Sequence, residues 1–297
     1  MNADSRILLV DNGSLEPAST QQLRRLAAGL TERVRVEVVP ASVAHSSKIP
    51  AEQLDGRPAE LFEAALDRVL REGAIDVRVV PLFVGPSYAI VRHVPAVIAE
   101  QQTRFPQVRI ALADPLAVAG EPRLAQILAA HVREILTSTA MNGEAGARGG
   151  TKVRVAVVDH GSPSRAVTDV RDAVAAQARD LLGDEVAAVT ACSMERRDGP
   201  EYAFNEPLLA NLLREDGWRD GPVVVALLFI APGKHAGDEG DVAQIVRRAR
   251  PDGGAGVRFT PVLGAHPLLL EVLADRARDV RCSRLEPTAV AGAVGTL

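Results

Sequence analysis

The chain has 297 residues, of which 47% are hydrophobic, 24% are charged and 3% are aromatic, and its formal net charge at pH 7 is −4. This composition is typical of a globular protein with room for two domains, and it excludes the basic, aromatic-rich surface that binds nucleic acid. No apolar run reaches the roughly 18 residues of a membrane span, no signal peptide is expected, and Cys192 and Cys282 match no zinc or redox spacing, so we expect a cytoplasmic protein without a membrane partner.

Short apolar runs alternate with helical patterns along the first half of the chain. The predicted strands lie near 6–11, 34–40, 76–84 and 108–113. The predicted helices lie near 18–32, 58–72, 91–103 and 121–136. A segment rich in Gly, Ala and Ser follows, and its composition predicts a flexible linker, which we place at 139–151.

The second half repeats this order. Its strands are predicted near 153–159, 185–191, 222–230 and 257–262. Its helices are predicted near 164–181, 205–215, 239–249 and 267–279. Runs such as VVVALLFI are apolar without alternation, as in parallel strands that are buried on both faces. We therefore predict an α/β fold with two tandem flavodoxin-like domains, each a mainly parallel sheet with helices on both faces, at 1–138 and 152–283, followed by a flexible tail at 284–297.

The two halves also share motifs. RILLVDNGS in the first half matches RVAVVDHGS in the second, which places Asn12 opposite His160. PLFVGPSYA matches LLFIAPGKH, which places Ala89 opposite His235. A third pair, VRIALADPLA and VRFTPVLGAH, is weaker. The second half alone therefore carries an imidazole at both of these positions.

Three side chains of the second half follow consecutive predicted strands. His160 follows the first strand, Glu195 the second and His235 the third. Because the carboxyl ends of parallel strands lie at one edge of a sheet, we expect the three to converge there. Two imidazoles and a carboxylate suit a divalent transition metal, and Asp159 is predicted to orient the ring of His160 by accepting its other N–H.

Structural roles are the alternative for each of these residues. A histidine in a loop is more often a surface or capping residue than a ligand. Ser162 is also typical of a helix N-cap, and Asp159 of a residue that satisfies the backbone of a turn. His266 precedes a predicted helix and is expected either to cap it or to support the ligands. His45, His93 and His131 show no such convergence, and His131 is expected to be structural.

The segments VDHGS, FIAPGKHAGDEGDV and PVLGAHPLLLEVLADR resemble the sirohydrochlorin chelatases, class II enzymes that insert cobalt, iron or nickel into sirohydrochlorin. The resemblance covers the second half and, as a degenerate copy, the first. It implies that His160 and His235 bind the metal and that Glu195 is a ligand or a proton acceptor. The metal ion would be a substrate, no organic cofactor is implied, and cobalamin or siroheme biosynthesis would be the setting.

An acidic tetrapyrrole would be the partner molecule, held between two halves that form an internal pseudo-dimer. The residues expected to bind it flank the strand ends of both halves: Ser162, Arg165, Arg196, Arg197, Lys234, Asn12, Ser87 and Tyr88. Each cation is about as easily explained as part of a solvated surface. The segment 193–207 is longer and more charged than an ordinary strand-to-helix loop, which leaves the substrate open.

The preferred interpretation is a metal chelatase acting on a sirohydrochlorin-like tetrapyrrole. The alternative is a tetrapyrrole or metal carrier derived from a chelatase, which the altered loop at 193–207 favours and the retained His160, His235 and Glu195 disfavour. A weaker third possibility is an enzyme that acts on another metal chelate or a different acidic substrate. The sequence does not choose the metal, because imidazole and carboxylate accept several divalent ions.

Overall fold

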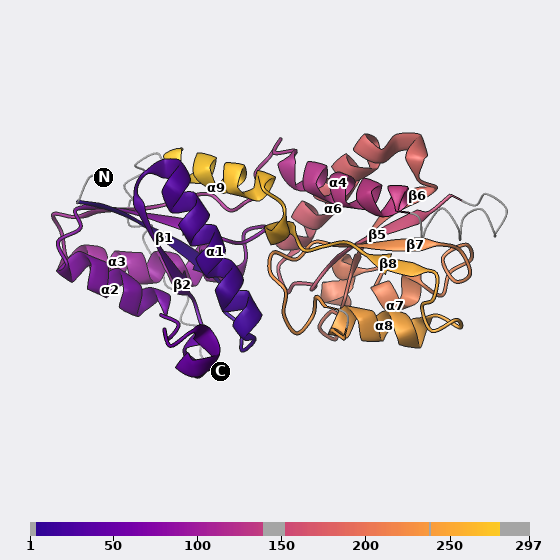
Figure 1. The fold of residues 1–297 in the computed structure, drawn as a ribbon, viewed down its shortest axis with the longest axis horizontal. Coiled ribbons are helices and arrows are strands. Elements are labelled where there is room, and N and C mark those ends of the chain that lie inside the picture. Colours follow the sequence, from indigo (N-terminus) through magenta and orange to yellow (C-terminus); the bar gives the residue numbers. More distant parts are fainter. Residues whose placement is uncertain (1–3, 139–151, 238, 280–297) are drawn as a thin grey trace.

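The computed structural model describes residues 4–138, 152–237 and 239–279. The predicted linker at 139–151, the predicted tail at 284–297 and Cys282 lie outside these ranges. Two α/β lobes lie side by side, each built on one sheet (Figure 1). No described helix is both long enough and apolar enough to cross a membrane.

Each lobe contains a parallel sheet of four strands. The first lobe has the order β2-β1-β3-β4 and the second has the order β6-β5-β7-β8. The strands are β1 (Ser5–Asp11), β2 (Glu37–Ser42), β3 (Asp76–Pro81), β4 (Arg109–Leu112), β5 (Arg154–Asp159), β6 (Ala188–Ser193), β7 (Val223–Leu227) and β8 (Val257–Phe259). Every strand predicted from the sequence is present, and the predicted pair of parallel α/β sheets is confirmed.

The helices are α1 (Pro17–Val34), α2 (Phe62–Arg71), α3 (Val94–Arg104), α4 (Arg123–Thr137), α6 (Arg165–Leu182), α7 (Leu209–Leu212), α8 (Asp241–Ala249) and α9 (Leu268–Arg278). The helix predicted near 205–215 is reduced to the single turn of α7, which follows a 3₁₀ segment at Pro200–Asn205 in the sequence. Pro207 explains this difference, because it lacks an N–H and favours the extended conformation that Glu206 adopts before it.

Helices cover both faces of each sheet. Successive strand residues point to opposite faces, so Ile7 packs with one apolar cluster and Leu8 with another. In the first lobe, α2 and α3 supply the cluster around Leu8. In the second lobe, α7 and α8 supply the corresponding cluster around Val158. The remaining face of each sheet belongs to one apolar cluster that runs through both lobes.

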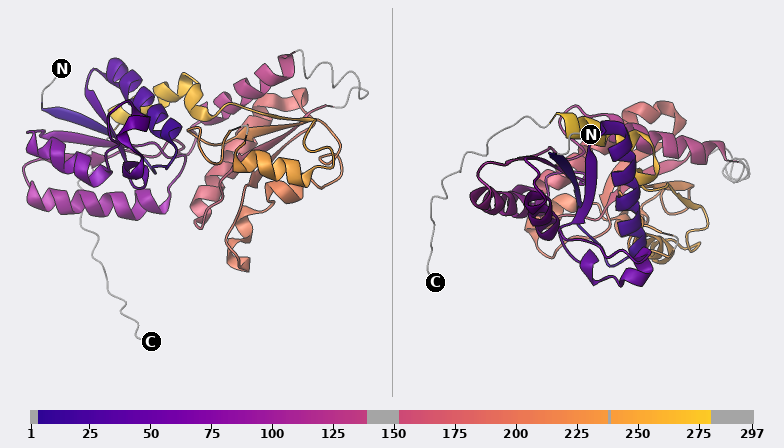
Figure 2. Two further views of the ribbon diagram at one scale, coloured as in Figure 1. Left: turned by 60° about the horizontal axis from the view of Figure 1, so that its bottom comes forward. Right: turned by 60° about the vertical axis from the view of Figure 1, so that its left-hand side comes forward.

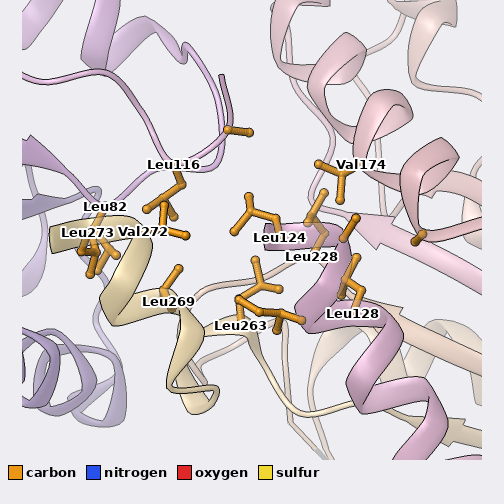
Figure 3. Close-up of a cluster of buried hydrophobic side chains, with 14 of the residues drawn as sticks. Leu82, Leu116, Leu124, Leu128, Val174, Leu228, Leu263, Leu269, Val272 and Leu273 are labelled. Carbon is orange, nitrogen blue, oxygen red and sulfur yellow. The ribbon is translucent and has the colours of Figure 1, made fainter. Parts of the chain in front are cut away.

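The last helix of each half crosses to the other lobe. α4 packs on α6 and β7 of the second lobe, and α9 packs on α1 and β3 of the first. Figures 1 and 2 show α9 in yellow beside the first sheet. In Figure 3, Leu128 of α4 lies beside Leu228, and Leu273 of α9 lies beside Leu82. Each lobe is therefore built from both halves of the sequence, while the domain boundaries at 1–138 and 152–283 stay a prediction.

Buried polar contacts hold α9 against the first lobe. Arg276 of α9 donates to the carbonyl oxygens of Pro115 and Leu116, both at 2.9 Å, and pairs with Glu121 at 3.1 Å. Arg276 and Glu121 are both buried. A buried cation needs such partners, because removing it from water is costly unless its donors are satisfied.

Candidate metal and substrate site

The turn after β5 presents His160 at the edge of the second sheet. Gly161 has a φ of +92°, and a Cβ there would clash with the backbone carbonyl of Glu195. Only glycine combines this conformation with such a close approach. The backbone N–H of Glu195 donates to the carbonyl of His160 at 3.2 Å, so the turns after β5 and β6 are bonded together.

The three residues predicted for metal chemistry lie together at this edge. The rings of His160 and His235 are edge to face, with centroids 4.7 Å apart and planes inclined by 74°. Nε2 of His160 lies 3.6 Å from a carboxylate oxygen of Glu195. All three side chains are partly exposed. The structure thus brings together the side chains that the strand order predicts, and their roles stay predictions.

Each imidazole uses Nδ1 for a contact with the protein. Nδ1 of His235 lies 2.8 Å from a carboxylate oxygen of Asp241, and Nδ1 of His160 lies 3.2 Å from the carbonyl of Gly161. Both partners are hydrogen-bond acceptors, so in the neutral rings Nδ1 carries the proton. The lone pair on each Nε2 is then available to a metal ion.

Asp159 has a different role from the predicted one. It accepts hydrogen bonds from the backbone N–H of Gly161 at 3.1 Å and the hydroxyl of Ser193 at 2.6 Å, and it lies 3.8 Å from the guanidinium of Arg171. The prediction that it orients His160 is therefore wrong, and the alternative of a turn residue holds. Burial raises the pKa of Asp159, and the Ser193 hydroxyl and Arg171 oppose that rise.

Asp241 was missed by the sequence reasoning. The segment GDEGD after His235 contains several acidic residues, and spacing alone does not tell which of them turns back to the imidazole. Across the described parts of the chain, no group of three or more His, Cys, Asp or Glu side chains is arranged to hold one metal ion. A third ligand bond from Glu195 therefore stays a prediction.

Two of the predicted cations lie over aromatic rings beside the site. The guanidinium of Arg165 lies 4.9 Å from the ring centre of Phe204, and that of Arg197 lies 5.9 Å from the ring centre of Tyr202. Both rings belong to the loop at 193–207. Stacking on an aromatic face restricts a guanidinium while leaving its edge available for a carboxylate.

The other two cations have carboxylate neighbours. Arg196 donates through Nε to Glu206 at 2.8 Å and also bonds backbone carbonyls of its own loop. The contact with Arg196 holds the pKa of the Glu206 carboxyl below its usual range. Lys234 is largely exposed, with its ammonium 3.9 Å from Asp241. Arg196 is thus engaged within the loop, whereas Lys234 is only loosely paired.

Ser162 is occupied by its own turn. Its hydroxyl accepts from the backbone N–H of Ser164 at 3.0 Å, and its backbone N–H donates to the side chain of Asn205 at 2.9 Å. Asn205 returns a hydrogen bond to the carbonyl of Ser162 at 3.0 Å and is buried. The N-cap of α6 is Ser164, so the alternative prediction that Ser162 is the helix N-cap is wrong, and its substrate contact stays a prediction.

The first lobe has the same pair of hydrogen-bonded turns but lacks the imidazole and the carboxylate of the second. The N–H of Ala44 bonds the carbonyl of Asn12 at 3.2 Å, as Glu195 bonds His160, so Ala44 takes the place of the acidic residue. Asn12 and Tyr88 are exposed, Tyr88 by 72%. The hydroxyl of Ser87 is buried and has no hydrogen-bond partner among the described residues. This buried position does not support the predicted contact between Ser87 and a substrate.

The loop that carries His235 lies against the first lobe. A Cβ on Gly233 would lie 3.9 Å from Cβ of Glu16 and from the hydroxyl of Ser14, in the turn after β1. Nearby, Gln22 of α1 donates to the carbonyl of Gly264 at 2.6 Å. The strand edge of the first lobe therefore borders the histidine site of the second.

Two other histidines, His131 and His266, form a second pair of rings. His131 of α4 is buried and packs edge to face on His266, with ring centres 5.4 Å apart. Burial and the nearby His266 lower the pKa of His131. Nδ1 of His266 accepts the N–H of Leu268, the first residue of α9, at 3.1 Å, although the N-cap residue itself is Pro267.

Comparisons with known proteins agree with the fold. A family model described as CbiX matches residues 6–135 and 154–280, and no curated protein sequence matches significantly. SirB from Bacillus subtilis with Fe³⁺ is similar with a TM-score of 0.67 and 17% identity, over 93% of this chain and 95% of that one. SirB from Bacillus subtilis subspecies spizizenii with cobalt has a TM-score of 0.66 and 17% identity, over 93% and 94% of the chains. CbiX, the terminal enzyme of siroheme biosynthesis in denitrifying bacteria, has a TM-score of 0.57 and 20% identity, over 92% and 98%.

Proposed function

The chain belongs to the CbiX family, and from this premise we propose that it inserts a divalent metal ion into a sirohydrochlorin-type tetrapyrrole. The observation that carries the proposal is the pair of imidazoles, His160 and His235, with ring centres 4.7 Å apart at the carboxyl edge of the second sheet. The similar SirB structures hold Fe³⁺ and cobalt, which supports iron or cobalt as the substrate metal. Nickel is retained from the sequence resemblance.

The reaction exchanges one metal ion for two protons on the pyrrole nitrogens. His160 and His235 hold the incoming ion through their Nε2 lone pairs. Glu195, 3.6 Å from Nε2 of His160, accepts one of the two protons as the ring takes up the metal, and the other passes to water. The metal has to leave for four ring nitrogens, so a site with few protein ligands suits transfer better than a closed tetrahedral site. Partial exposure of the three side chains leaves room for the macrocycle.

The acidic macrocycle binds beside the histidines. Arg165 and Arg197, stacked over Phe204 and Tyr202, supply guanidinium edges for its carboxylates, and Lys234 adds a third cation. Arg196 shapes the loop through its bond to Glu206, and its own contact with the substrate stays a prediction. From the first lobe, the exposed Asn12 and Tyr88 contact the macrocycle, so that the two lobes act as an internal pseudo-dimer around one site. We expect this activity in the cytoplasm, in siroheme or cobalamin biosynthesis.

Absorbance spectroscopy tests the proposal. The protein is incubated with metal-free sirohydrochlorin and Co²⁺, Ni²⁺ or Fe²⁺, and metal insertion is followed through the change in the macrocycle spectrum. We expect a rate above that of the same mixture without protein for at least one metal, and a loss of that gain in His160→Ala. A protein that binds the macrocycle and never exceeds the uncatalysed rate would instead be a carrier.

A further inference from the structure

We propose that Asp241 is a positioning residue that fixes the ring of His235, so that its Nε2 is presented to the metal ion. This inference rests on the proposed function, since it assigns a role towards the metal that His235 holds. Nδ1 of His235 and a carboxylate oxygen of Asp241 are 2.8 Å apart, a distance typical of a charge-assisted hydrogen bond. An imidazole that donates Nδ1–H to a carboxylate has a defined tautomer, a defined orientation and a more basic Nε2.

The backbone holds the two residues in register. The N–H of Asp241 donates to the carbonyl of Lys234 at 3.0 Å, and the N–H of Val242 donates to the carbonyl of His235 at 3.2 Å. Asp241 is also the first residue of α8, so its carboxylate projects from the beginning of a helix rather than from a loop. These two bonds tie the backbone of Lys234 and His235 to the start of α8.

Core packing alone does not fix the loop. Pro232, Ala236 and Gly237 line a pocket of about 370 Å³, which residues 259–262 also line. The loop therefore borders open space on that side instead of close-packed side chains. His235 is restrained by the backbone bonds, by the neighbouring rings of His160 and Phe229, and by Asp241. Of these contacts, the bond to Asp241 is the one made through Nδ1.

Two related strand ends, at His160 in the second lobe and at Ala89 in the first, lack a carboxylate bonded to an imidazole Nδ1. Nδ1 of His160 contacts only the carbonyl of its neighbour Gly161, at 3.2 Å, and 48% of its side chain is exposed against 33% for His235. In the first lobe, Ala89 leads directly into a helical turn at Ala89–His93 that contains no acidic residue. Among these related positions in the described chain, a carboxylate partner on Nδ1, which leaves Nε2 to the metal ion, therefore occurs only at His235.

A role at the helix end is the competing explanation. A carboxylate in the first turn of α8 stabilises that helix through its dipole, whatever it does for His235. Asp241→Asn keeps the shape of the side chain and an acceptor oxygen but removes the charge. The affinity for Co²⁺, measured by calorimetry on the full chain, is expected to fall by roughly 10- to 100-fold in this variant, as for other lost partners of a ligating imidazole.

Glu239→Gln is the matched control. Glu239 lies in the same loop, pairs with Arg247 at 2.9 Å and is 88% exposed, so removing its charge is expected to leave Co²⁺ affinity unchanged. Proton NMR of the Co²⁺-loaded protein provides a second measurement. We expect an exchangeable, paramagnetically shifted Nδ1–H resonance from His235 in the unmodified chain, shifted or lost in Asp241→Asn and retained in Glu239→Gln.

A double-mutant cycle separates the outcomes. In a His235→Ala background, Asp241→Asn is expected to cause no further loss of Co²⁺ affinity, because a positioning residue has nothing left to position. An equal loss in both backgrounds would assign Asp241 to the helix end and overturn the inference. If His235→Ala weakens Co²⁺ binding and Asp241→Asn does not, the inference fails and the metal site stands. If neither variant weakens binding, the proposed metal site itself fails.

Discussion

In the first lobe the turn after β1 has the same construction as the turn after β5 in the second. Asp11 accepts the N–H of Gly13 at 3.0 Å, and Asp159 accepts the N–H of Gly161 at 3.1 Å. Both glycines have a positive φ and approach the turn after the neighbouring strand. The residue between the Asp and the Gly of each turn is Asn12 in the first lobe and His160 in the second. The two turns therefore share their backbone structure, while only the second carries a side chain that donates to a metal.

Beneath the turns the two lobes differ again. In the second lobe Arg171, buried in α6, donates to the hydroxyl of Ser193 at 2.5 Å and lies 3.8 Å from Asp159. The same sequence offset that relates Asn12 to His160 places Leu23 at the corresponding position of α1. Desolvation raises the pKa of Asp11 to about 6, opposed by hydrogen bonds from Ser42 and Gly13 but, within the described residues, by no cation. The lobe that carries the histidines is thus also the lobe that places a buried cation beneath its turn.

The largest expected effect concerns whether the lobes exist apart. We expect residues 152–297, produced alone, to show no cooperative unfolding, because they lack α4 and the buried Leu124 and Leu128 that cover the second sheet. Circular dichroism during thermal unfolding is the measurement. Mixing in residues 1–138 is expected to restore a transition, and an independent transition of 152–297 would mean that the exchanged helix is dispensable.

The next prediction concerns Glu195, for which the first lobe has Ala44. Glu195→Gln keeps the shape of the side chain but removes the base, so we expect metal insertion to slow by roughly 100-fold. Macrocycle binding should be retained, which a titration by absorbance checks. Glu52→Gln, on the exposed surface of the first lobe, is the control and should insert metal at the original rate. A Glu195→Gln variant as fast as the unmodified chain would remove this carboxylate from the mechanism.

The two imidazoles are expected to give a smaller change in metal affinity. His160→Ala and His235→Ala should each weaken Co²⁺ or Ni²⁺ binding by roughly 10-fold or more, since a lost ligand costs at least as much as a lost partner of a ligand. Asn12→Ala, at the position of the first lobe that corresponds to His160, should leave affinity unchanged. Calorimetry compares the three, and equal affinities would refute the assignment of the metal to the second lobe.

The sequence predicts the strands of this protein and the residues at their ends better than it predicts the packing of its helices and loops. Apolar runs and the rule for parallel strand ends were enough to place His160, Glu195 and His235 at one edge. The exchange of α4 and α9 was not predictable, because an amphipathic helix buries its apolar face equally well against either sheet. The bond from His235 to Asp241 was missed, and the turn role of Asp159 was predicted only as the alternative, because both depend on how a loop returns in space.

The smallest expected effect, a difference in stability, tests the contrast beneath the turns. The pKa of Asp11 is about 6 in the folded protein, above its ordinary value of 3.8, so the folded state binds the proton more tightly. Stability is therefore lost as the pH rises from about 4 through 6, and the loss persists above that range. Asp11→Asn cannot ionise and should raise Tm at pH 7 by roughly 2–4 °C for about 1 kcal/mol, with little gain at pH 4. Scanning calorimetry at both pH values measures this, with the exposed Asp114→Asn as control.

Asp159→Asn should gain less stability at pH 7 than Asp11→Asn, because Arg171 already offsets part of the charge of Asp159. An equal gain at both sites would show that this cation does not distinguish the lobes.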